Sequence, residues 1–261
     1  MPSVFGKLVR NLFGTAGFEI RRKPNDLTRP LDRPTGTDAL MRLSRRGVGL
    51  FNTVIDVGAS DGIWSEKLMH HVPSADYFLI EALPVHESGL KAFCARHPNA
   101  SYVLAAAAAE EGEISFATTD DPFGGGASGD PTGANNIRLP ATTIDAQVAK
   151  RRLRGPFLIK LDTHGFEVPI LAGAKDTLEQ TDVLVIECYN FTLTPGCLQF
   201  FEMCEKMRSM GFRCIDLFDI GYRPGDTALW QMDMVFMRAD RPEFQDNTFH
   251  CEALRPASCF T

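Results

Sequence analysis

Apolar positions along the middle of the chain alternate between two spacings. Short, nearly continuous apolar runs are typical of buried strands, and the segments between them repeat apolar residues every three or four positions, as amphipathic helices do. The predicted strands cover residues 53–58, 77–82, 101–109, 112–120, 156–164, 182–190, 212–220 and 232–239. The predicted helices cover residues 61–72, 86–97, 141–153, 167–179 and 195–211.

This order of elements predicts an α/β fold. Helices between consecutive strands allow the strands to pair in parallel, with helices on both faces of the sheet. The last two strands are separated only by the turn-rich segment 221–231, so we expect them to form an antiparallel hairpin. Five consecutive alanines at 105–109 favour a helix by propensity, but the length and phase of segment 101–109 fit a strand.

The alternating pattern is interrupted near the N-terminus and in one long internal segment. Apolar residues among the first 22 positions predict a short amphipathic helix, which would pack on its own domain, on a dimer mate or on a membrane surface. A proline-rich connector over 22–37 and a short helix that ends at Gly47 follow it. Residues 122–136 are rich in Gly, Pro and Asn, which predicts a long loop of the kind that often forms a lid or binds a ligand.

Composition and charge narrow the classes of protein that remain. The chain has 261 residues, 44% of them hydrophobic and 23% charged, as expected for a globular protein with a sizeable core. Its net charge of −6 disfavours nucleic-acid binding, which relies on a basic surface. The seven cysteines contain no Cys-x-x-Cys pair, which is typical of reduced thiols in a cytoplasmic protein. No apolar stretch approaches the roughly 18 residues that a membrane span needs.

Polar side chains gather where the predicted strands end. The carboxyl ends of parallel strands form one rim of an open α/β sheet, and ligands bind at that rim. The residues concerned are Asp56, Gly58, Ala59, Ser60 and Asp61 at the first strand, Glu81 and Ala82 at the second, Asp162 and His164 at the fourth main strand, and Glu187, Tyr189 and Asn190 at the fifth. Their convergence predicts a ligand site at this rim.

The glycine loop after the first strand limits the kind of ligand. Gly58 and Gly62 are spaced G-x-x-x-G, and Ser60 stands where a dinucleotide site needs a glycine for the approach of the pyrophosphate. A phosphate-binding P-loop is excluded because no G-K-[ST] follows. Glu81 ends the next strand, where a carboxylate commonly bonds ribose hydroxyls. A ligand with ribose but no pyrophosphate fits best, and S-adenosylmethionine is the common one.

Several segments resemble the FkbM family of S-adenosylmethionine-dependent methyltransferases. They occur in the family's order over about residues 50–190, and they read VIDVGASDGIWS, LIEALP, AAAAAEEGEISF, TTIDAQV, LIKLDTHGFEVPILAGAKDTL and VLVIECYNF. The resemblance implies a Rossmann-like class I methyltransferase fold, with a mostly parallel seven-stranded sheet and an antiparallel last strand. It also implies that the loop around Asp56 and Gly58 holds the methionine moiety and that Glu81 holds the ribose.

The resemblance also implies a division of the chain and a reaction. A methyltransferase domain is expected over 50–240, with an N-terminal segment over 1–49 on the acceptor side and a C-terminal tail over 241–261. The expected reaction is O-methylation of a sugar or secondary metabolite, so the partner is a small-molecule or glycan acceptor. The acceptor pocket is expected from the N-terminal 50 residues, loop 121–136 and segment 219–231. Candidate walls of that pocket are Phe191, Tyr222 and Trp230.

The stretch LIKLDTHGFE carries the candidate catalytic residues. The family pattern is commonly Lys-x-Asp-x-Glu-Gly, and here His164 replaces the glutamate. Asp162 is a candidate base, a metal ligand or a helix cap, and His164 is suited to act as a base near neutral pH. Lys160 lies on the same side of the strand as Asp162 and is expected to pair with a carboxylate. Glu167 is interpreted as a first-turn carboxylate that favours the helix dipole.

Three further hypotheses follow from the same residues. Magnesium could bind Asp162 together with Glu187 or Asn190, because such oxygen ligands suit it. A nicotinamide-dependent oxidoreductase or epimerase is an alternative, which the missing G-x-G-x-x-G disfavours. A binding module that keeps the methyltransferase fold without catalysis is the other alternative.

Overall fold

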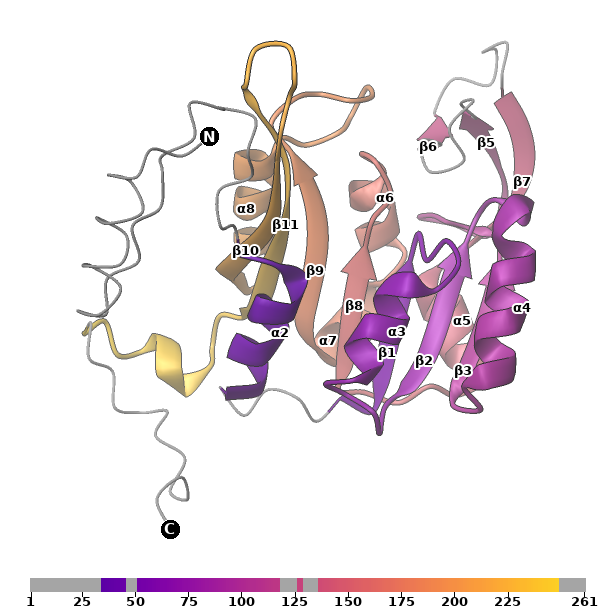
Figure 1. Ribbon diagram of the computed structural model, residues 1–261, viewed down its shortest axis with the longest axis horizontal. Helices are drawn as coiled ribbons and strands as arrows, with labels where there is room; N and C mark the ends of the chain where they lie inside the picture. Colours follow the sequence, from indigo (N-terminus) through magenta and orange to yellow (C-terminus); the bar gives the residue numbers. More distant parts are fainter. Residues whose placement is uncertain (1–33, 46–50, 118–125, 129–135, 249–261) are drawn as a thin grey trace, which may run out of the picture. The chain divides into compact units, whose positions relative to one another are not determined.

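The computed structural model describes residues 34–45, 51–117, 126–128 and 136–248 (Figure 1). A seven-stranded sheet runs through it in the order β10-β11-β9-β8-β1-β2-β3. Its strands are β1 (Thr53–Val57), β2 (Asp76–Glu81), β3 (Ala100–Leu104), β8 (Phe157–Leu161), β9 (Thr181–Tyr189), β10 (Phe212–Tyr222) and β11 (Leu229–Arg238). β11 lies between β9 and β10 and is antiparallel to both. The predicted Rossmann-like class I fold with its antiparallel last strand is confirmed.

Helices cover both faces of this sheet, and the central strands are apolar on both sides. One face packs against α2 (Gly36–Arg45), α3 (Ile63–Met69) and α4 (Glu87–Arg96). The other face packs against α5 (Ile144–Arg151), α6 (Glu167–Ala172), α7 (Lys175–Glu179) and α8 (Phe200–Ser209). Every residue of β1 and β8 is buried, which explains their nearly continuous apolar runs. Two short 3-10 helices, Pro84–His86 and Pro242–Phe244, complete the described elements.

A second, smaller sheet differs from the prediction. It has the order β4-β7-β5-β6, built from β4 (Ala106–Ala107), β5 (Gly112–Ala117), β6 (Gly126–Ser128) and β7 (Asn136–Thr142). The predicted strand 101–109 therefore divides at Ala105 into β3 and β4. The predicted helix 141–153 begins only at Ile144, because the residues before it pair with β5. This pairing joins segments distant along the chain, so the local pattern gave no sign of it.

The predicted helix over 167–179 is also divided. α6 ends before Gly173, and α7 starts at Lys175. A Cβ atom at Gly173 would lie 2.1 Å from the backbone oxygen of Ala108, so only glycine allows this close approach of the two segments. The break is therefore a consequence of packing against the β4 region.

Helix α2 is the only described part of the N-terminal segment. Thr35 and Asp38 cap its start through reciprocal hydrogen bonds of their side chains. Ala39 and Leu43 are buried in the core on the α3 side of the sheet, and Arg42 pairs with Asp216 of β10. The amphipathic helix predicted in the first 22 residues, most of loop 122–136 and the end of the C-terminal tail lie outside the described residues.

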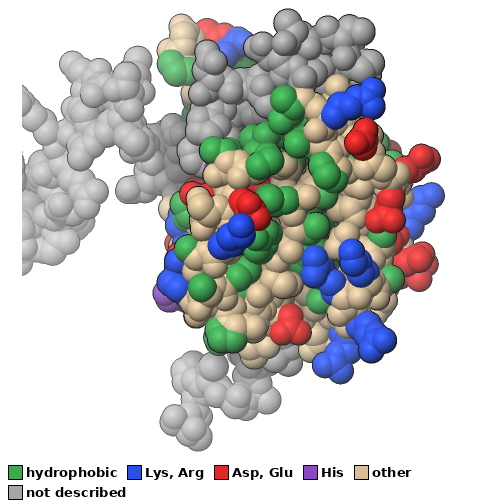
Figure 2. Space-filling model, turned by 90° about the vertical axis from the view of Figure 1, so that its right-hand side faces the viewer, with side chains coloured by type: hydrophobic (Ala, Val, Ile, Leu, Met, Phe, Trp, Pro, Cys, Tyr) green, Lys and Arg blue, Asp and Glu red, His purple; other side chains and the backbone are tan. Residues whose placement is uncertain are grey.

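The side of the molecule at the β3 edge carries mixed charges. Figure 2 shows acidic and basic side chains interspersed with hydrophobic ones on this side. Charged side chains at a sheet edge disfavour pairing with another sheet. Among the described residues, no helix is long and apolar enough to cross a membrane.

Candidate active site

A cavity of about 230 Å³ opens at the carboxyl ends of β1, β2 and β8. Most of its lining comes from the glycine loop after β1, the end of β2 with the following turn, the β4 region, and the loop after β8, and β5, α6 and β9 contribute one residue each. The lining residues are Val57, Gly58, Ser60, Ile80, Glu81, Ala82, Leu83, His86, Ala105, Ala106, Ala107, Phe116, Asp162, Thr163, His164, Phe166, Ile170 and Glu187. The cavity lies at the rim where ligands of open α/β sheets bind.

The glycine loop that follows β1 lies against the end of β8 at the cavity. Gly58 has a φ of +76°, and a Cβ atom there would lie 2.0 Å from the backbone oxygen of Asp162. Glycine is therefore required at this position, both by the conformation and by the close approach of two backbones. As a result, the backbone of the loop borders the same cavity as the residues of the β8 end.

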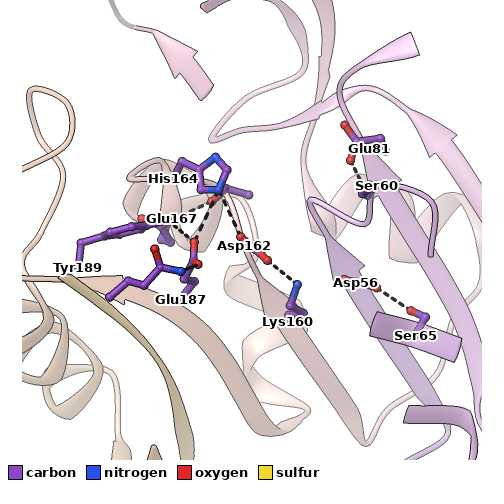
Figure 3. Close-up of polar contacts among 12 residues, drawn as sticks. Asp56, Ser60, Ser65, Glu81, Lys160, Asp162, His164, Glu167, Glu187 and Tyr189 are labelled. Carbon is purple, nitrogen blue, oxygen red and sulfur yellow. Dashed lines mark hydrogen bonds and ion pairs between the residues drawn. The ribbon is translucent and has the colours of Figure 1, made fainter. Parts of the chain in front are cut away.

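Glu81 anchors this loop from the end of β2. Its carboxylate accepts hydrogen bonds from the backbone N–H groups of Ser60, at 2.7 Å, and Leu83, at 2.8 Å (Figure 3). It is 6% exposed and lines the cavity. Each carboxylate oxygen has a second lone pair, so Glu81 can also accept hydrogen bonds from ligand hydroxyls.

Three of the seven predicted cofactor-binding residues do not line the cavity. Asp56 is fully buried and accepts a hydrogen bond of 2.6 Å from the Ser65 hydroxyl, and burial raises the pKa of Asp56. Asp61 contacts the His86 imidazole at 3.1 Å, and Ala59 belongs to the core. Gly58, Ser60, Glu81 and Ala82 line the cavity directly.

At the end of β8, the buried Lys160 forms an ion pair of 2.8 Å with the half-buried Asp162. Burial disfavours the charge on Lys160, but the carboxylates of Asp56 and Asp162 outweigh burial and raise its pKa. Burial likewise opposes ionisation of Asp162, but the charge of Lys160 outweighs it and lowers the pKa of Asp162. Both groups are therefore charged at neutral pH, and Asp162 is a weak base.

Glu187, on the neighbouring strand β9, is protonated, whereas Asp162 is ionised. It accepts hydrogen bonds from the Tyr189 hydroxyl and, at 2.7 Å, from the Gln231 amide. Burial and the charge of Asp162 raise the pKa of Glu187 to about 9, so it carries a proton at neutral pH. Asp233 faces Glu187 across the β9–β11 register, and burial raises its pKa to about 7.

The His164 imidazole lies between these two carboxyl groups (Figure 3). Its Nε2 is 3.6 Å from Asp162 Oδ1 and 3.7 Å from Glu187 Oε2, and its ring meets the Tyr189 ring edge-on. The backbone of His164 has a φ of +53°, a left-handed conformation that costs a residue other than glycine about 1 kcal/mol. Strain of this kind is concentrated at functional sites.

Two of the three predicted magnesium ligands, Asp162 and Glu187, lie together at the site. Asp162, His164 and Glu187 offer ligand atoms within 4.8 Å of one another, but the Lys160 ammonium already neutralises Asp162. The Asn190 amide donates to the backbone oxygen of Leu229, at 3.2 Å, and does not line the cavity. The positive charge at this site comes from Lys160.

Two of the three predicted acceptor walls contact each other. The rings of Phe191 and Trp230 have centroids 5.2 Å apart, and Trp230 also meets Tyr189 edge-on. The Arg223 guanidinium lies 4.2 Å from the centre of the Phe191 ring. These side chains form a row that leads from His164 toward the β10–β11 hairpin. Tyr222, in contrast, is 46% exposed.

The sequence interpretation missed several lining residues. His86 stands near the end of β2, at a place where the rim argument could have found it. Phe116 and the β4 alanines reach the cavity only because the small sheet folds over it. No local signal identifies them.

The fold and this rim site are those of a Rossmann-like class I methyltransferase. A family model described as the methyltransferase FkbM domain matches residues 56–214, which include the glycine loop and the strands of the site. The chain belongs to this family. It is therefore a methyltransferase, and S-adenosylmethionine as methyl donor agrees with that class. A comparison with curated proteins gave no significant match.

Solved structures with low sequence identity are similar to this chain. A putative O-methyltransferase from Klebsiella pneumoniae is 10% identical, with a TM-score of 0.46 over 88% of this chain and 96% of that chain. The fibrillarin pre-rRNA processing protein of Methanococcus jannaschii is 15% identical, with a TM-score of 0.45 over 76% and 74%. Precorrin-6y C5,15-methyltransferase of Geobacter metallireducens is 11% identical, with a TM-score of 0.42 over 77% and 88%.

The stability of the protein is expected to fall as the pH rises from about 4.5 to about 9, because Glu187 loses its proton over this window. The pKa of Glu187 is about 9 in the folded protein and 4.5 in the unfolded chain. The protonated side chain therefore stabilises the fold fully below pH 4.5, and this stabilisation is lost as the pH rises to about 9. Glu187→Gln keeps an acceptor oxygen and cannot ionise. We expect it to remove up to about 1.4 kcal/mol per pH unit of this dependence.

Urea unfolding at several pH values within this window measures the effect. The exposed Glu205→Gln on α8 is the matched control and is expected to leave the dependence unchanged. The same pH dependence in wild type and Glu187→Gln would show that Glu187 is ionised in the folded protein.

Proposed function

We propose that the protein transfers a methyl group from S-adenosylmethionine to a hydroxyl group of a sugar or another small metabolite. The observation that carries the proposal is one cavity with two chemically different ends. Glu81 and Ser60 lie on one side of it and His164 on the other (Figure 3), and Gly58 and Asp162 meet between them. Such a cavity can hold a nucleoside at one end and present a reacting group to an imidazole at the other.

The residues at the first end suit the donor. Glu81 can accept the ribose hydroxyls, and the backbone at Gly58 and Ser60 allows close approach of the methionine moiety. Apolar side chains of the β2 end and the small sheet suit an adenine ring, and they are Ala82, Leu83, Ala105, Ala106, Ala107 and Phe116. When bound, S-adenosylmethionine supplies a methyl group on a sulfonium sulfur, which keeps the electron pair of the broken carbon–sulfur bond.

The residues at the other end suit deprotonation of a hydroxyl acceptor. Asp162 is held ionised by Lys160, and Glu187 already carries a proton, so neither takes up the hydroxyl proton readily. The His164 imidazole is the remaining base. The nearby Asp162 carboxylate stabilises the imidazolium that forms when His164 accepts the proton. This arrangement supplies a general base without a metal ion.

The aromatic row leading from the site favours a small acceptor with apolar faces. Tyr189, Trp230 and Phe191 contact each other in sequence along this row, and a sugar ring or a natural-product scaffold can pack against such rings. The mixed charges in Figure 2 provide no continuous basic surface for nucleic acid on the face shown.

Calorimetry with S-adenosylmethionine tests the donor. Glu81→Ala is expected to weaken binding about 10- to 100-fold, because the ribose loses an ionic hydrogen-bond acceptor and the glycine loop loses its anchor. The control is Glu87→Ala, a carboxylate at the start of α4 that pairs with Lys91 outside the cavity.

Three outcomes would contradict the proposal. Equal affinity of wild type and Glu81→Ala for S-adenosylmethionine would show that Glu81 does not bind the donor. Binding of a nicotinamide dinucleotide instead would favour an oxidoreductase. Tight binding of S-adenosylmethionine without methylation of any member of a hydroxylated acceptor panel would favour a non-catalytic binding module.

A further inference from the structure

We propose that Glu167 is a positioning residue that holds the His164 imidazole between Asp162 and Glu187. The inference rests on the proposed function, since it concerns the base of that reaction. Glu167 is the first residue of α6 and lies behind the loop that follows β8. It does not line the cavity, whereas Thr163, His164 and Phe166 of the loop do.

Glu167 forms hydrogen bonds with the residues immediately before and after His164 in the sequence. Its Oε1 accepts a hydrogen bond of 3.0 Å from the Thr163 hydroxyl and another of 3.0 Å from the backbone N–H of Gly165. Thr163 and Gly165 are the two neighbours of His164 in the sequence. One carboxylate oxygen thus holds the side chain of the residue before His164 and the backbone of the residue after it, and Figure 3 shows Glu167 next to His164.

The loop needs such a restraint because its backbone is in an unfavourable conformation. His164 has a φ of +53°, and Gly165 has a φ of +100°. Two consecutive positive values are uncommon, and a residue other than glycine adopts them only where surrounding contacts impose them. Gly165 is also confined by Cys197, whose Sγ would lie 3.0 Å from a Cβ atom at this position. Without the hydrogen bonds to Glu167, the loop is free to relax and move the imidazole.

Support of the helix dipole does not explain this carboxylate. Glu167 is 3% exposed, and an exposed acidic residue would serve the dipole without the cost of burial. Burial raises the pKa of Glu167, and the hydrogen bonds from the loop oppose this shift. A buried carboxylate that fixes the two neighbours of a strained histidine is what the support of a catalytic residue requires.

Two substitutions separate positioning from general stability. Glu167→Gln keeps an acceptor oxygen for both donors, whereas Glu167→Leu fills the space and keeps neither hydrogen bond. The matched control is Asp145→Leu. Asp145, in the first turn of α5, accepts the same kinds of hydrogen bonds, from the hydroxyl and the backbone N–H of Thr177 in α7. It does not line the cavity.

The first readout is the nuclear Overhauser contact between the ring protons of His164 and Tyr189, which requires no turnover. We expect this contact in wild type, Glu167→Gln and Asp145→Leu, and its loss in Glu167→Leu. The second readout is kcat, measured with an acceptor that the wild-type protein methylates. Glu167→Leu is expected to lower kcat about 10- to 100-fold with a smaller change in KM, because a displaced base slows the chemical step. Glu167→Gln is expected to retain most of kcat.

The outcomes distinguish this inference from the proposed function. A retained ring contact and unchanged kcat in Glu167→Leu would overturn the positioning role. Equal losses of kcat in Glu167→Leu and Asp145→Leu would also overturn it, because stability alone would then explain both. If Glu167→Leu does not fold, Thr163→Val removes one of the two hydrogen bonds and is expected to weaken the same ring contact. Loss of the contact in a protein that methylates no acceptor would support positioning while contradicting the function.

Discussion

Replacement of His164 with glutamine is expected to lower the kcat of methyl transfer by about 10²- to 10⁴-fold, the usual contribution of a general base. The affinity for S-adenosylmethionine is expected to change little, because Glu81 and Ser60 lie across the cavity from His164 (Figure 3). Asp162 and Glu187 cannot replace the imidazole, since Lys160 lowers the pKa of Asp162 despite its burial and Glu187 already carries a proton.

Single-turnover kinetics with saturating donor measures this effect, and calorimetry checks donor binding. His97→Gln is the matched control, because His97 caps the end of α4 and is paired with Glu66 away from the cavity. An unchanged kcat in His164→Gln would mean that the acceptor reaches the methyl group already deprotonated or that another group takes its proton.

Removal of the buried cation, in Lys160→Met, is expected to lower the free energy of unfolding by about 3–5 kcal/mol. The ammonium is 2.8 Å from Asp162, faces Asp56 across the β1–β8 register and lies over the Trp64 ring. Its removal leaves the fully buried Asp56 and the half-buried Asp162 with no neutralising charge. This cost is larger than the median value of a surface ion pair.

Urea denaturation gives the free energy, provided that the slope with denaturant is unchanged. Asp162→Asn in the Lys160→Met background is expected to recover part of the loss, so the two changes are not additive. Lys67→Met on the exposed side of α3 is the control and is expected to change stability little. A small effect of Lys160→Met would show that Asp162 is protonated or hydrated in the folded protein.

The central strands were predictable because their signals are local. The apolar runs of β1, β8 and β9 and the amphipathic pattern of α4 and α8 are set by the period of each element and by burial of its apolar side. The position of the ligand rim follows from the parallel pairing of these strands. For this reason the sequence alone predicts that Gly58, Glu81, Asp162 and His164 lie near one another.

Other features depend on contacts between distant segments. Residues 136–142 have no strand pattern of their own, and they form β7 only because β5 supplies hydrogen-bond partners. The break between α6 and α7 results from the contact of Gly173 with the backbone of Ala108. Such effects are invisible to periodicity, which describes one element at a time.

The chemical roles at the site divide in the same way. The sequence by itself determined the residue types, the order of the strands and the single rim to which Lys160, Asp162, His164 and Glu187 belong. Only the tertiary structure decided which of them is charged, because the pKa of each group depends on its burial and on the distances to its neighbours. It also showed that Glu167, besides starting a helix, anchors a strained loop, since its hydrogen bonds with Thr163 and Gly165 depend on the left-handed turn that the loop adopts in the folded protein.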